Sequence, residues 1–117
     1  MLNVLVVEDD ADARFLAADT FRKVGHTVRE AEHGQRALEI LSVERWLPHV
    51  IVLDVAMPVM DGFTFLSIKK RIVALSAIPV IILSATARGP IADVCCVLAK
   101  PFDAKVLLDA VLQFAVR

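Results

Sequence analysis

Short unbroken runs of apolar residues constrain the fold of this chain more than any other feature of its sequence. The three clearest runs are Val4–Val7, Val50–Leu53 and Val80–Leu83. A strand that is covered on both faces reads as a continuous apolar run, whereas a strand with one wet face alternates apolar and polar residues. Because 57% of the residues are apolar and only 23% are charged, we expect a buried parallel sheet with helices on both faces.

Strand and helix patterns alternate along the chain. The predicted strands are Asn3–Val7, Thr27–Ala31, Val50–Leu53, Pro79–Leu83 and Cys95–Leu98. The predicted helices are Asp10 or Ala11 to Val24, Gly34–Trp46, Phe63–Ala74 and Asp103–Val116. Strict alternation with right-handed crossovers predicts an α/β fold with one open, doubly wound parallel sheet.

Residues that favour helix ends mark the limits of several of these helices. Phe15, Leu16, Phe21 and Val24 recur at helical spacing in the first helix, and Gly25 is a stop signal. Asp103 is placed to cap the last helix. The segment between Ser84 and Cys95 is different, because it carries Gly89–Pro90 and is too short for a typical helix of about 11 residues with its turns. We therefore expect the fourth crossover helix to be missing or reduced to a turn.

Composition excludes several classes of protein. At 117 residues we expect one domain, 1–117, without an effector domain. No segment reaches the roughly 20 apolar residues that cross a bilayer, so we expect a soluble cytoplasmic protein with no membrane partner. The net charge of -1 argues against nucleic acid as a partner. The adjacent Cys95 and Cys96 are expected to be reduced and mostly buried, because neighbouring strand residues point to opposite faces.

Polar residues follow the predicted strands at their carboxyl ends, where open α/β sheets bind ligands. They are Glu8, Asp9 and Asp10 after the first strand, Asp54 after the third, Ser84 after the fourth and Lys100 after the fifth. Converging carboxylates repel one another unless a cation lies among them, and oxygen ligands suit Mg²⁺. An aspartate is also a nucleophile toward phosphorus. This edge therefore predicts Mg²⁺ binding and phosphate chemistry at Asp54.

Four sequence strings together resemble the receiver domain of two-component response regulators. They are Val4–Asp10, Val52–Gly62, Ile78–Ala85 and Lys100–Phe102, which stand in family order and span nearly the whole chain. The resemblance implies a five-stranded parallel sheet of order 2-1-3-4-5, as in flavodoxin-like folds. It also implies a phosphoacceptor that works as a signalling switch or relay, and not an enzyme.

The resemblance assigns a role to each polar residue of the edge. Asp54 would accept a phosphoryl group from a histidine kinase or phosphotransfer protein. The Mg²⁺ ligands would be Glu8, Asp9, Asp54 and the backbone carbonyl of Ala56. Ser84 would donate its hydroxyl to the phosphoryl group and Lys100 would pair with it. Pro101 would follow a cis peptide bond that aims the lysine. Asp61 and Gly62 are expected to form the turn that starts the third helix.

The chain departs from the family pattern at the residues that usually carry the output. Val97 occupies the position, three before the lysine, that is usually aromatic. The last helix is apolar nearly all round, with only Lys105, Asp109 and Gln113 as a polar stripe. Such a helix is usually covered, so we expect an output partner or a homodimer through this last helix, the fifth in the family's numbering, and the face of the fourth and fifth strands.

Three other functions remain alternatives. The first is a receiver-derived interaction module that works without phosphorylation, as Val97 and the short fourth crossover suggest. The second is a flavin protein, which the acidic residues after the first strand disfavour because they would repel a flavin phosphate. The third is an aspartate-based phosphatase, which Ala56 disfavours because such an enzyme needs a second aspartate there as general acid. His26, His33 and His49 lack spacing for metal binding and are expected at the surface.

Overall fold

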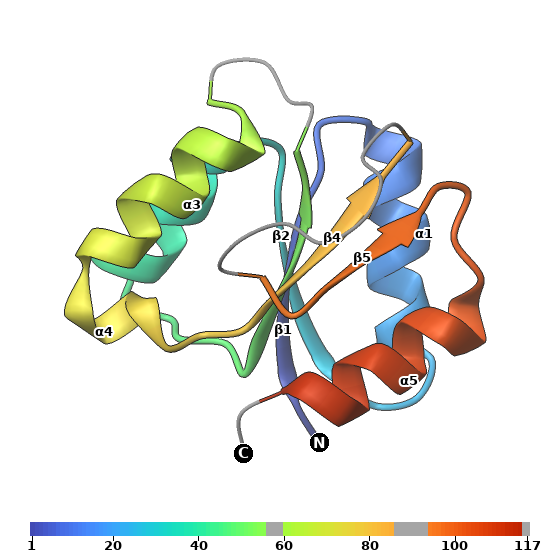
Figure 1. Ribbon diagram of the computed structural model, residues 1–117. Coiled ribbons are helices and arrows are strands. Elements are labelled where there is room, and N and C mark those ends of the chain that lie inside the picture. Colours follow the sequence, from blue (N-terminus) through green and yellow to red (C-terminus); the bar gives the residue numbers. More distant parts are fainter. Residues whose placement is uncertain (56–59, 86–93, 116–117) are drawn as a thin grey trace.

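The computed structural model describes residues 1–55, 60–85 and 94–115, and these form one parallel sheet between two layers of helices (Figure 1). The strands are β1 (Asn3–Val7), β2 (Thr27–Ala31), β3 (Val50–Asp54), β4 (Val80–Ser84) and β5 (Cys96–Ala99). Their order in the sheet is β2-β1-β3-β4-β5, and every neighbouring pair is parallel. The predicted fold class is therefore confirmed, and each strand agrees with its predicted range to within one residue.

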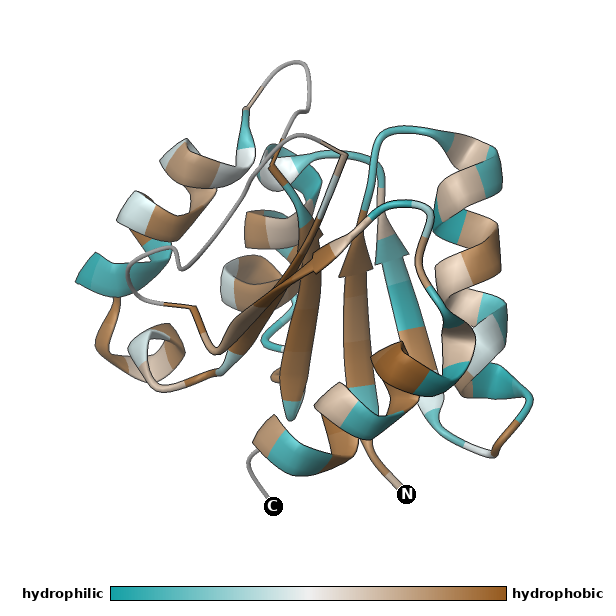
Figure 2. Ribbon diagram, turned by 45° about the vertical axis from the view of Figure 1, so that its right-hand side comes forward, coloured by the Kyte–Doolittle hydropathy of each residue, from teal (hydrophilic) through white to brown (hydrophobic). Residues whose placement is uncertain are grey.

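Each face of the sheet has its own apolar core. Helices α1 (Ala11–Arg22) and α5 (Ala104–Phe114) cover one face, and α2 (Gly34–Leu38), α3 (Gly62–Arg71) and α4 (Val73–Ser76) lie on the other (Figure 1). Consecutive strand residues alternate between the two cores, so that Leu5 and Val7 belong to one and Val4 and Val6 to the other. Figure 2 shows the resulting apolar central strands. Burial on both faces explains the unbroken apolar runs.

Helix α1 is shorter than predicted, and it buries a different face. It begins after Asp10, whose carboxylate accepts a hydrogen bond from the Ala13 amide, and ends at Arg22. Gly25 follows with a φ of 92°, the left-handed conformation that glycine tolerates best. The predicted apolar face is wrong in part, because Phe15 and Leu16 are 57% and 58% exposed. The small side chains of Ala17 and Ala18 are buried with Phe21 instead, since they let the helix approach the sheet closely.

The second predicted helix, Gly34–Trp46, is wrong at its carboxyl end. Regular α2 stops at Leu38 and continues as one π-helical turn, η1 (Glu39–Val43), in which the Glu44 amide bonds the Glu39 carbonyl. Arg45 then adopts a φ of 55° and ends the helical path. Trp46 therefore lies outside the helix, half-buried against the core with the Arg29 guanidinium 5.7 Å from its ring centroid.

The third predicted helix, Phe63–Ala74, is divided in two. Ile72 takes an extended conformation, with φ of -100° and ψ of 113°, and separates α3 from the single turn of α4. Lys69 is buried and its ammonium donates to the Ser76 carbonyl at 3.3 Å. This cation meets the carbonyl end of α4, where the backbone needs donors, and so stabilises the break.

The carboxyl-terminal part of the chain contains β5 and α5. Asp103 caps α5 as predicted, accepting hydrogen bonds from the amides of Lys105 and Val106. The prediction of a missing or reduced helix between Ser84 and Cys95 concerns residues 86–93, which lie outside the described residues. The helix labelled α4 is a different segment: it is one turn long and precedes β4. Within the described residues, no helix is both long and apolar enough to cross a membrane.

Candidate functional site

The carboxyl edge of the sheet gathers the polar residues predicted from the sequence. Glu8 follows β1, Asp54 ends β3, Ser84 ends β4 and Lys100 follows β5. Because the strands are parallel and in register, their carboxyl ends reach the same edge, and the Lys100 amide bonds the Ser84 carbonyl at 2.9 Å. The fold thus brings to one place residues that span 92 positions of the chain, from Glu8 to Lys100.

Lys100 connects the two buried carboxylates of this edge. Its ammonium donates to Glu8 Oε1 and lies 3.6 Å from Asp54 Oδ2. Glu8 is only 4% exposed and Asp54 only 6% exposed, so both carboxylates are removed from bulk water. The peptide bond between Lys100 and Pro101 is cis, as the family resemblance implied. Asp54 and Glu8 therefore form a buried pair of carboxylates that share the Lys100 ammonium.

The pKa values record how the charges of this site interact. Burial, together with the neighbouring Asp54 and Asp9, raises the pKa of Glu8 to about 7 against the opposing effect of Lys100. Burial disfavours the charge of Lys100, but Glu8 and Asp54 outweigh that effect and raise the lysine's pKa. One ammonium does not balance three carboxylates. A second cation at this edge would relieve the remaining repulsion.

The acidic residues fit a small divalent cation. Oxygen atoms of Glu8, Asp9 and Asp54 all lie within 4.8 Å of one another. Mg²⁺ takes oxygen ligands, keeps several of its waters and needs only one or two carboxylates, so this spread suits it without a closed cage. Asp9 is exposed, which leaves a side open for water or phosphate oxygens. The predicted backbone ligand, Ala56, lies outside the described residues.

Ser84 is buried at 2% exposure at the end of β4, one residue beyond the pair formed by Asp54 and Leu83. Sequence reasoning placed a hydroxyl on this edge, and the structure has it there. Val97, at the position that is usually aromatic in the family, is half-buried against the core of the α2–α3 face.

The loop that returns from Asp54 depends on a glycine. Asp61 caps α3 through the Thr64 amide at 2.8 Å, as predicted, and the Gly62 amide bonds the Val55 carbonyl at 2.9 Å. A Cβ atom at Gly62 would lie 2.5 Å from the Val55 Cα and 3.0 Å from the Asp54 carbonyl oxygen. The start of α3 therefore packs directly on the backbone of the candidate phosphoacceptor.

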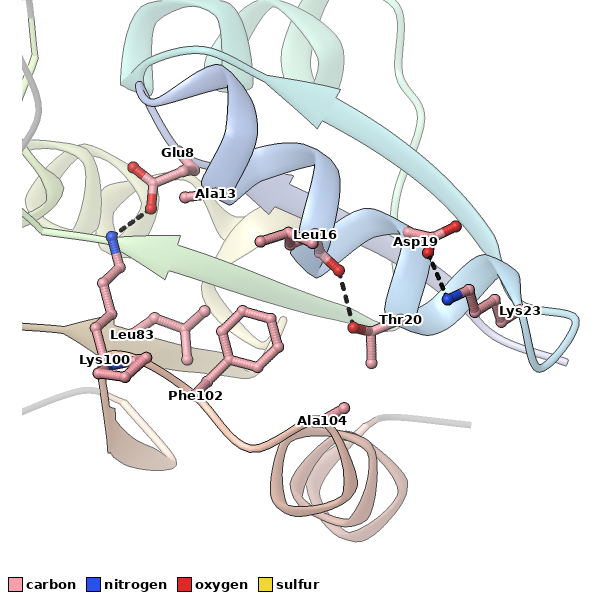
Figure 3. Close-up of a pocket in the computed structure, with 11 residues that line it drawn as sticks. Glu8, Ala13, Leu16, Asp19, Thr20, Lys23, Leu83, Lys100, Phe102 and Ala104 are labelled. Carbon is pink, nitrogen blue, oxygen red and sulfur yellow. Dashed lines mark hydrogen bonds and ion pairs between the residues drawn. The ribbon is translucent and has the colours of Figure 1, made fainter.

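An apolar cavity opens beside the acidic edge. It measures about 370 Å³ and lies between α1 and the segment that joins β5 to α5, with Leu16, Leu83 and Phe102 among its walls (Figure 3). Glu8 and Lys100 line one end of it. The sequence did not predict this cavity, because it forms between α1 and a loop near the other end of the chain.

The histidines have roles that sequence reasoning missed. The Nδ1 atom of each accepts a hydrogen bond from a backbone amide: His26 from Leu2 at 3.1 Å, His49 from Asn3 at 2.8 Å and His33 from Arg36 at 3.1 Å. His33 is the N-cap of α2, and His26 and His49 hold the amino end of β1. All three are half-buried.

Strand order and edge chemistry together define an α/β domain with an acidic, lysine-containing site at its carboxyl edge. The chain matches the response regulator receiver domain over residues 4–112, so it belongs to that family. The match covers all the described strands except the first residue of β1, and every predicted site residue.

Individual relatives agree with this assignment. Sporulation initiation phosphotransferase F of Bacillus subtilis is 33% identical over an alignment that covers 95% of this chain and 91% of that protein. A gliding motility regulatory protein of Myxococcus xanthus is 38% identical over 93% of this chain but only 12% of its own length. An uncharacterised 14.6 kDa protein of Leptolyngbya boryana is 39% identical over 74% of this chain and 65% of its own length. The chain thus spans less than two thirds of these last two relatives.

Solved structures share the fold. The chemotaxis protein CheY4 of Vibrio cholerae superposes with a TM-score of 0.87 at 27% identity, covering 97% of this chain and 98% of that one. A response regulator from Chloroflexus aurantiacus gives a TM-score of 0.85, also at 27% identity, over 99% of this chain and 98% of its own.

Proposed function

We propose that this receiver domain is a phosphorylation switch or relay in which Asp54 accepts a phosphoryl group from a histidine kinase or phosphotransfer protein. The observation that carries the proposal is the placement of the Asp54 carboxylate, 3.6 Å from the Lys100 ammonium and beside Glu8 and Asp9. A nucleophile, a neighbouring ammonium and a divalent-cation site are the parts that phosphoryl transfer requires.

In the proposed reaction an Asp54 carboxylate oxygen attacks the phosphorus atom of a phosphohistidine. The new bond is an acyl phosphate, the bond between phosphorus and the imidazole nitrogen breaks, and the imidazole leaves with the electron pair. A water molecule later attacks the same phosphorus, releases inorganic phosphate and restores the carboxylate. No external substrate is turned over in a cycle of this kind, so we regard the domain as a switch and not as an enzyme.

The surrounding residues would position the phosphoryl group and balance its charge. Mg²⁺, held by Glu8, Asp9 and Asp54 with the Ala56 carbonyl, would neutralise phosphoryl oxygens. Lys100 would move from Glu8 toward a phosphoryl oxygen and neutralise part of its negative charge. Ser84 would donate its hydroxyl to another phosphoryl oxygen. Burial of Asp54 and Glu8 strengthens each of these charge interactions, because the effective dielectric is lower than in water.

A protein donor needs a surface beside this edge, and α1 offers one. Phe15 and Leu16 are exposed apolar side chains on α1, and Leu16 also borders the cavity that reaches Glu8 and Lys100. Exposed apolar groups next to a reactive edge are suited to a transient protein partner. We place this exchange in the cytoplasm, where such donors act.

The proposal is tested with a small phosphodonor, acetyl phosphate, together with Mg²⁺. We expect wild type to gain the mass of one phosphoryl group, and we expect chelation of the metal to prevent the gain. Asp54→Asn should remain unmodified, because the amide is not a nucleophile. Asp12→Asn is the matched control, since Asp12 is an exposed aspartate in the first turn of α1. Equal labelling of Asp54→Asn and wild type, or no labelling of wild type, would refute the function.

A second candidate is an interaction module that works without phosphorylation. Val97 favours it, because this half-buried side chain is too small to act as an aromatic rotamer switch between the site and the β4–β5 face. In that case the partner, or a second copy of the chain, would bind the same face and α5 in either state of Asp54. Mg²⁺-dependent labelling that leaves partner affinity unchanged would favour this candidate over the switch.

A further inference from the structure

Arg14 is the charged residue that approaches the acidic edge from α1. Its Nη1 donates to the Glu8 carbonyl at 2.9 Å, and its Nε lies 3.4 Å from Glu30 Oε1 on β2. The side chain is 21% exposed and reaches back from the helix to the junction of β1 and α1. A single guanidinium therefore connects the end of β1, the first turns of α1 and the neighbouring strand β2.

The Glu8 carbonyl lies where the sheet no longer supplies a partner. The pairing of β1 with β3 ends at Val7 and Leu53, and the Glu8 amide makes the last bond to β2, through the Ala31 carbonyl at 3.0 Å. Arg14 takes the place of a ladder donor for the carbonyl of the same residue. Since a backbone carbonyl in a partly buried place needs a donor, this bond fixes its direction.

That direction matters because one peptide plane joins Glu8 to Asp9. The carbonyl of Glu8 and the amide of Asp9 belong to the same rigid unit, so turning it reorients the backbone from which both side chains depart. The Glu8 side chain is already held, with Oε1 on Lys100 and Oε2 accepting the Asp10 amide at 3.3 Å. Fixing the peptide plane then sets where the Asp9 carboxylate points relative to Glu8.

Glu30 holds Arg14 in place. It shares the α1 face of β2 with Val28, and its carboxylate also binds Arg22 Nη1 at 2.8 Å. Arg22 in turn donates to the Val28 carbonyl at 3.1 Å. Two arginines of α1 thus meet one glutamate, but only Arg14 touches the acidic edge.

We propose that Arg14 is a positioning residue of the phosphorylation site, which orients the Glu8–Asp9 peptide so that the two carboxylates are preset for Mg²⁺. The inference rests on the proposed function for its metal and extends it to a residue that touches neither metal nor phosphoryl group. Charge alone predicts the opposite effect: removing a cation beside an acidic site should tighten Mg²⁺ binding. The two explanations therefore differ in sign.

The test compares Arg14→Gln, Arg14→Lys and Arg22→Gln with wild type, with Mg²⁺ alone as the ligand. Binding is followed through the amide chemical shifts of Asp9 and Asp10, and folding through urea unfolding. We expect Arg14→Gln to weaken Mg²⁺ binding about tenfold, in the range found when outer partners of metal ligands are removed. Arg14→Lys should recover part of the loss, because an ammonium still donates to the carbonyl. Arg22→Gln, which loses a bond to the same Glu30, should bind Mg²⁺ as wild type does.

The inference is overturned if Arg14→Gln binds Mg²⁺ as tightly as wild type, or more tightly. It is also overturned if Arg22→Gln loses as much Mg²⁺ affinity as Arg14→Gln does, because the loss would then arise from the packing of α1. A wild type without any Mg²⁺ response contradicts the proposed function instead. In that case amide hydrogen exchange of Asp9 and Asp10 without metal decides the role of Arg14: faster exchange in Arg14→Gln but not in Arg22→Gln supports it, and equal exchange rejects it.

Discussion

Glu8 shows how much of the site depends on a single residue. Its amide, its carbonyl and both carboxylate oxygens each contact a different partner: Ala31, Arg14, Lys100 and the Asp10 amide. Burial makes its charge costly, and its pKa is raised to about 7. The contacts of Glu8 keep its carboxylate in a buried place where its negative charge is unfavourable. A divalent cation at the edge would stabilise that charge.

Gly62 is the residue whose substitution most directly tests the backbone behind Asp54. A Cβ atom there would meet Val55 Cα at 2.5 Å, so Gly62→Ala must displace the start of α3 or the end of β3. We expect a loss of about 1–3 kcal/mol in the free energy of unfolding, the usual cost of overpacking, measured by urea denaturation. Because Asp54 immediately precedes Val55, acetyl phosphate labelling should slow as well.

Gly25→Ala is the matched control for that prediction. Nothing lies within 4 Å of a Cβ at Gly25, but its φ of 92° disfavours any side chain. We expect a loss of about 1–2 kcal/mol from backbone strain, without any effect on labelling. Normal labelling in Gly62→Ala, or slowed labelling in Gly25→Ala, would contradict the link between Gly62 and the site.

At the scale of whole elements, the sequence predicted strands better than helices. Apolar runs identify strands because burial on both faces leaves no polar positions, and the acidic and lysine residues converge because parallel strands end at one edge. Helix ends were missed where local hydrogen bonding changed, at the π-helical turn after Leu38 and at the extended Ile72. The contacts of Arg14 and the three histidines could not be predicted, since they depend on which backbone groups the fold leaves without partners. The roles of Asp54, Ser84 and Lys100 in phosphoryl transfer stay predictions.

The amino end of β1 should make stability depend on pH. His26 accepts the Leu2 amide at Nδ1, and burial, followed by the positive amino terminus, lowers its pKa. A pKa lowered in the folded state gives stability that is complete above the ordinary histidine value of about 6.5 and is lost as pH falls below it. His49 and the Met1 amino group are the other ionisable groups that line this end among the described residues.

Between about pH 7.5 and about pH 5.5 we expect the free energy of unfolding of wild type to fall by about 1 kcal/mol relative to that of His26→Asn, through loss of the His26 hydrogen bond. His26→Asn is the control, because its Oδ1 stands where Nδ1 does and accepts the amide at every pH. Urea unfolding of both proteins at the two pH values measures the difference. If the free energy of unfolding changes by the same amount in both proteins, the His26 hydrogen bond does not contribute to the pH dependence.

For the whole molecule, β5 and α5 are the surfaces through which phosphorylation at the carboxyl edge would affect the binding of another protein. β5 is the last strand of the sheet, so its outer backbone edge has no neighbour among the described strands, and its side chains from Cys96 to Leu98 are only half-buried. On α5, Val106 and Leu112 are 49% and 46% exposed, whereas Leu107, Ala110 and Val111 are buried against the sheet. An unpaired edge strand and exposed apolar side chains on a helix are both features that association commonly covers.

We therefore expect the domain to self-associate, or to bind its output partner, through α5 and the β4–β5 face. Sedimentation velocity over a range of concentrations should detect dimers of wild type, and Val106→Lys should weaken them about tenfold, as loss of a central apolar contact does. Val73→Lys is the control, because Val73 is 90% exposed on α4, across the sheet. A monodisperse monomer at high concentration would reject the dimer. A dimer that strengthens with acetyl phosphate would make this face the output of the switch, and one that does not respond would favour the phosphorylation-independent module.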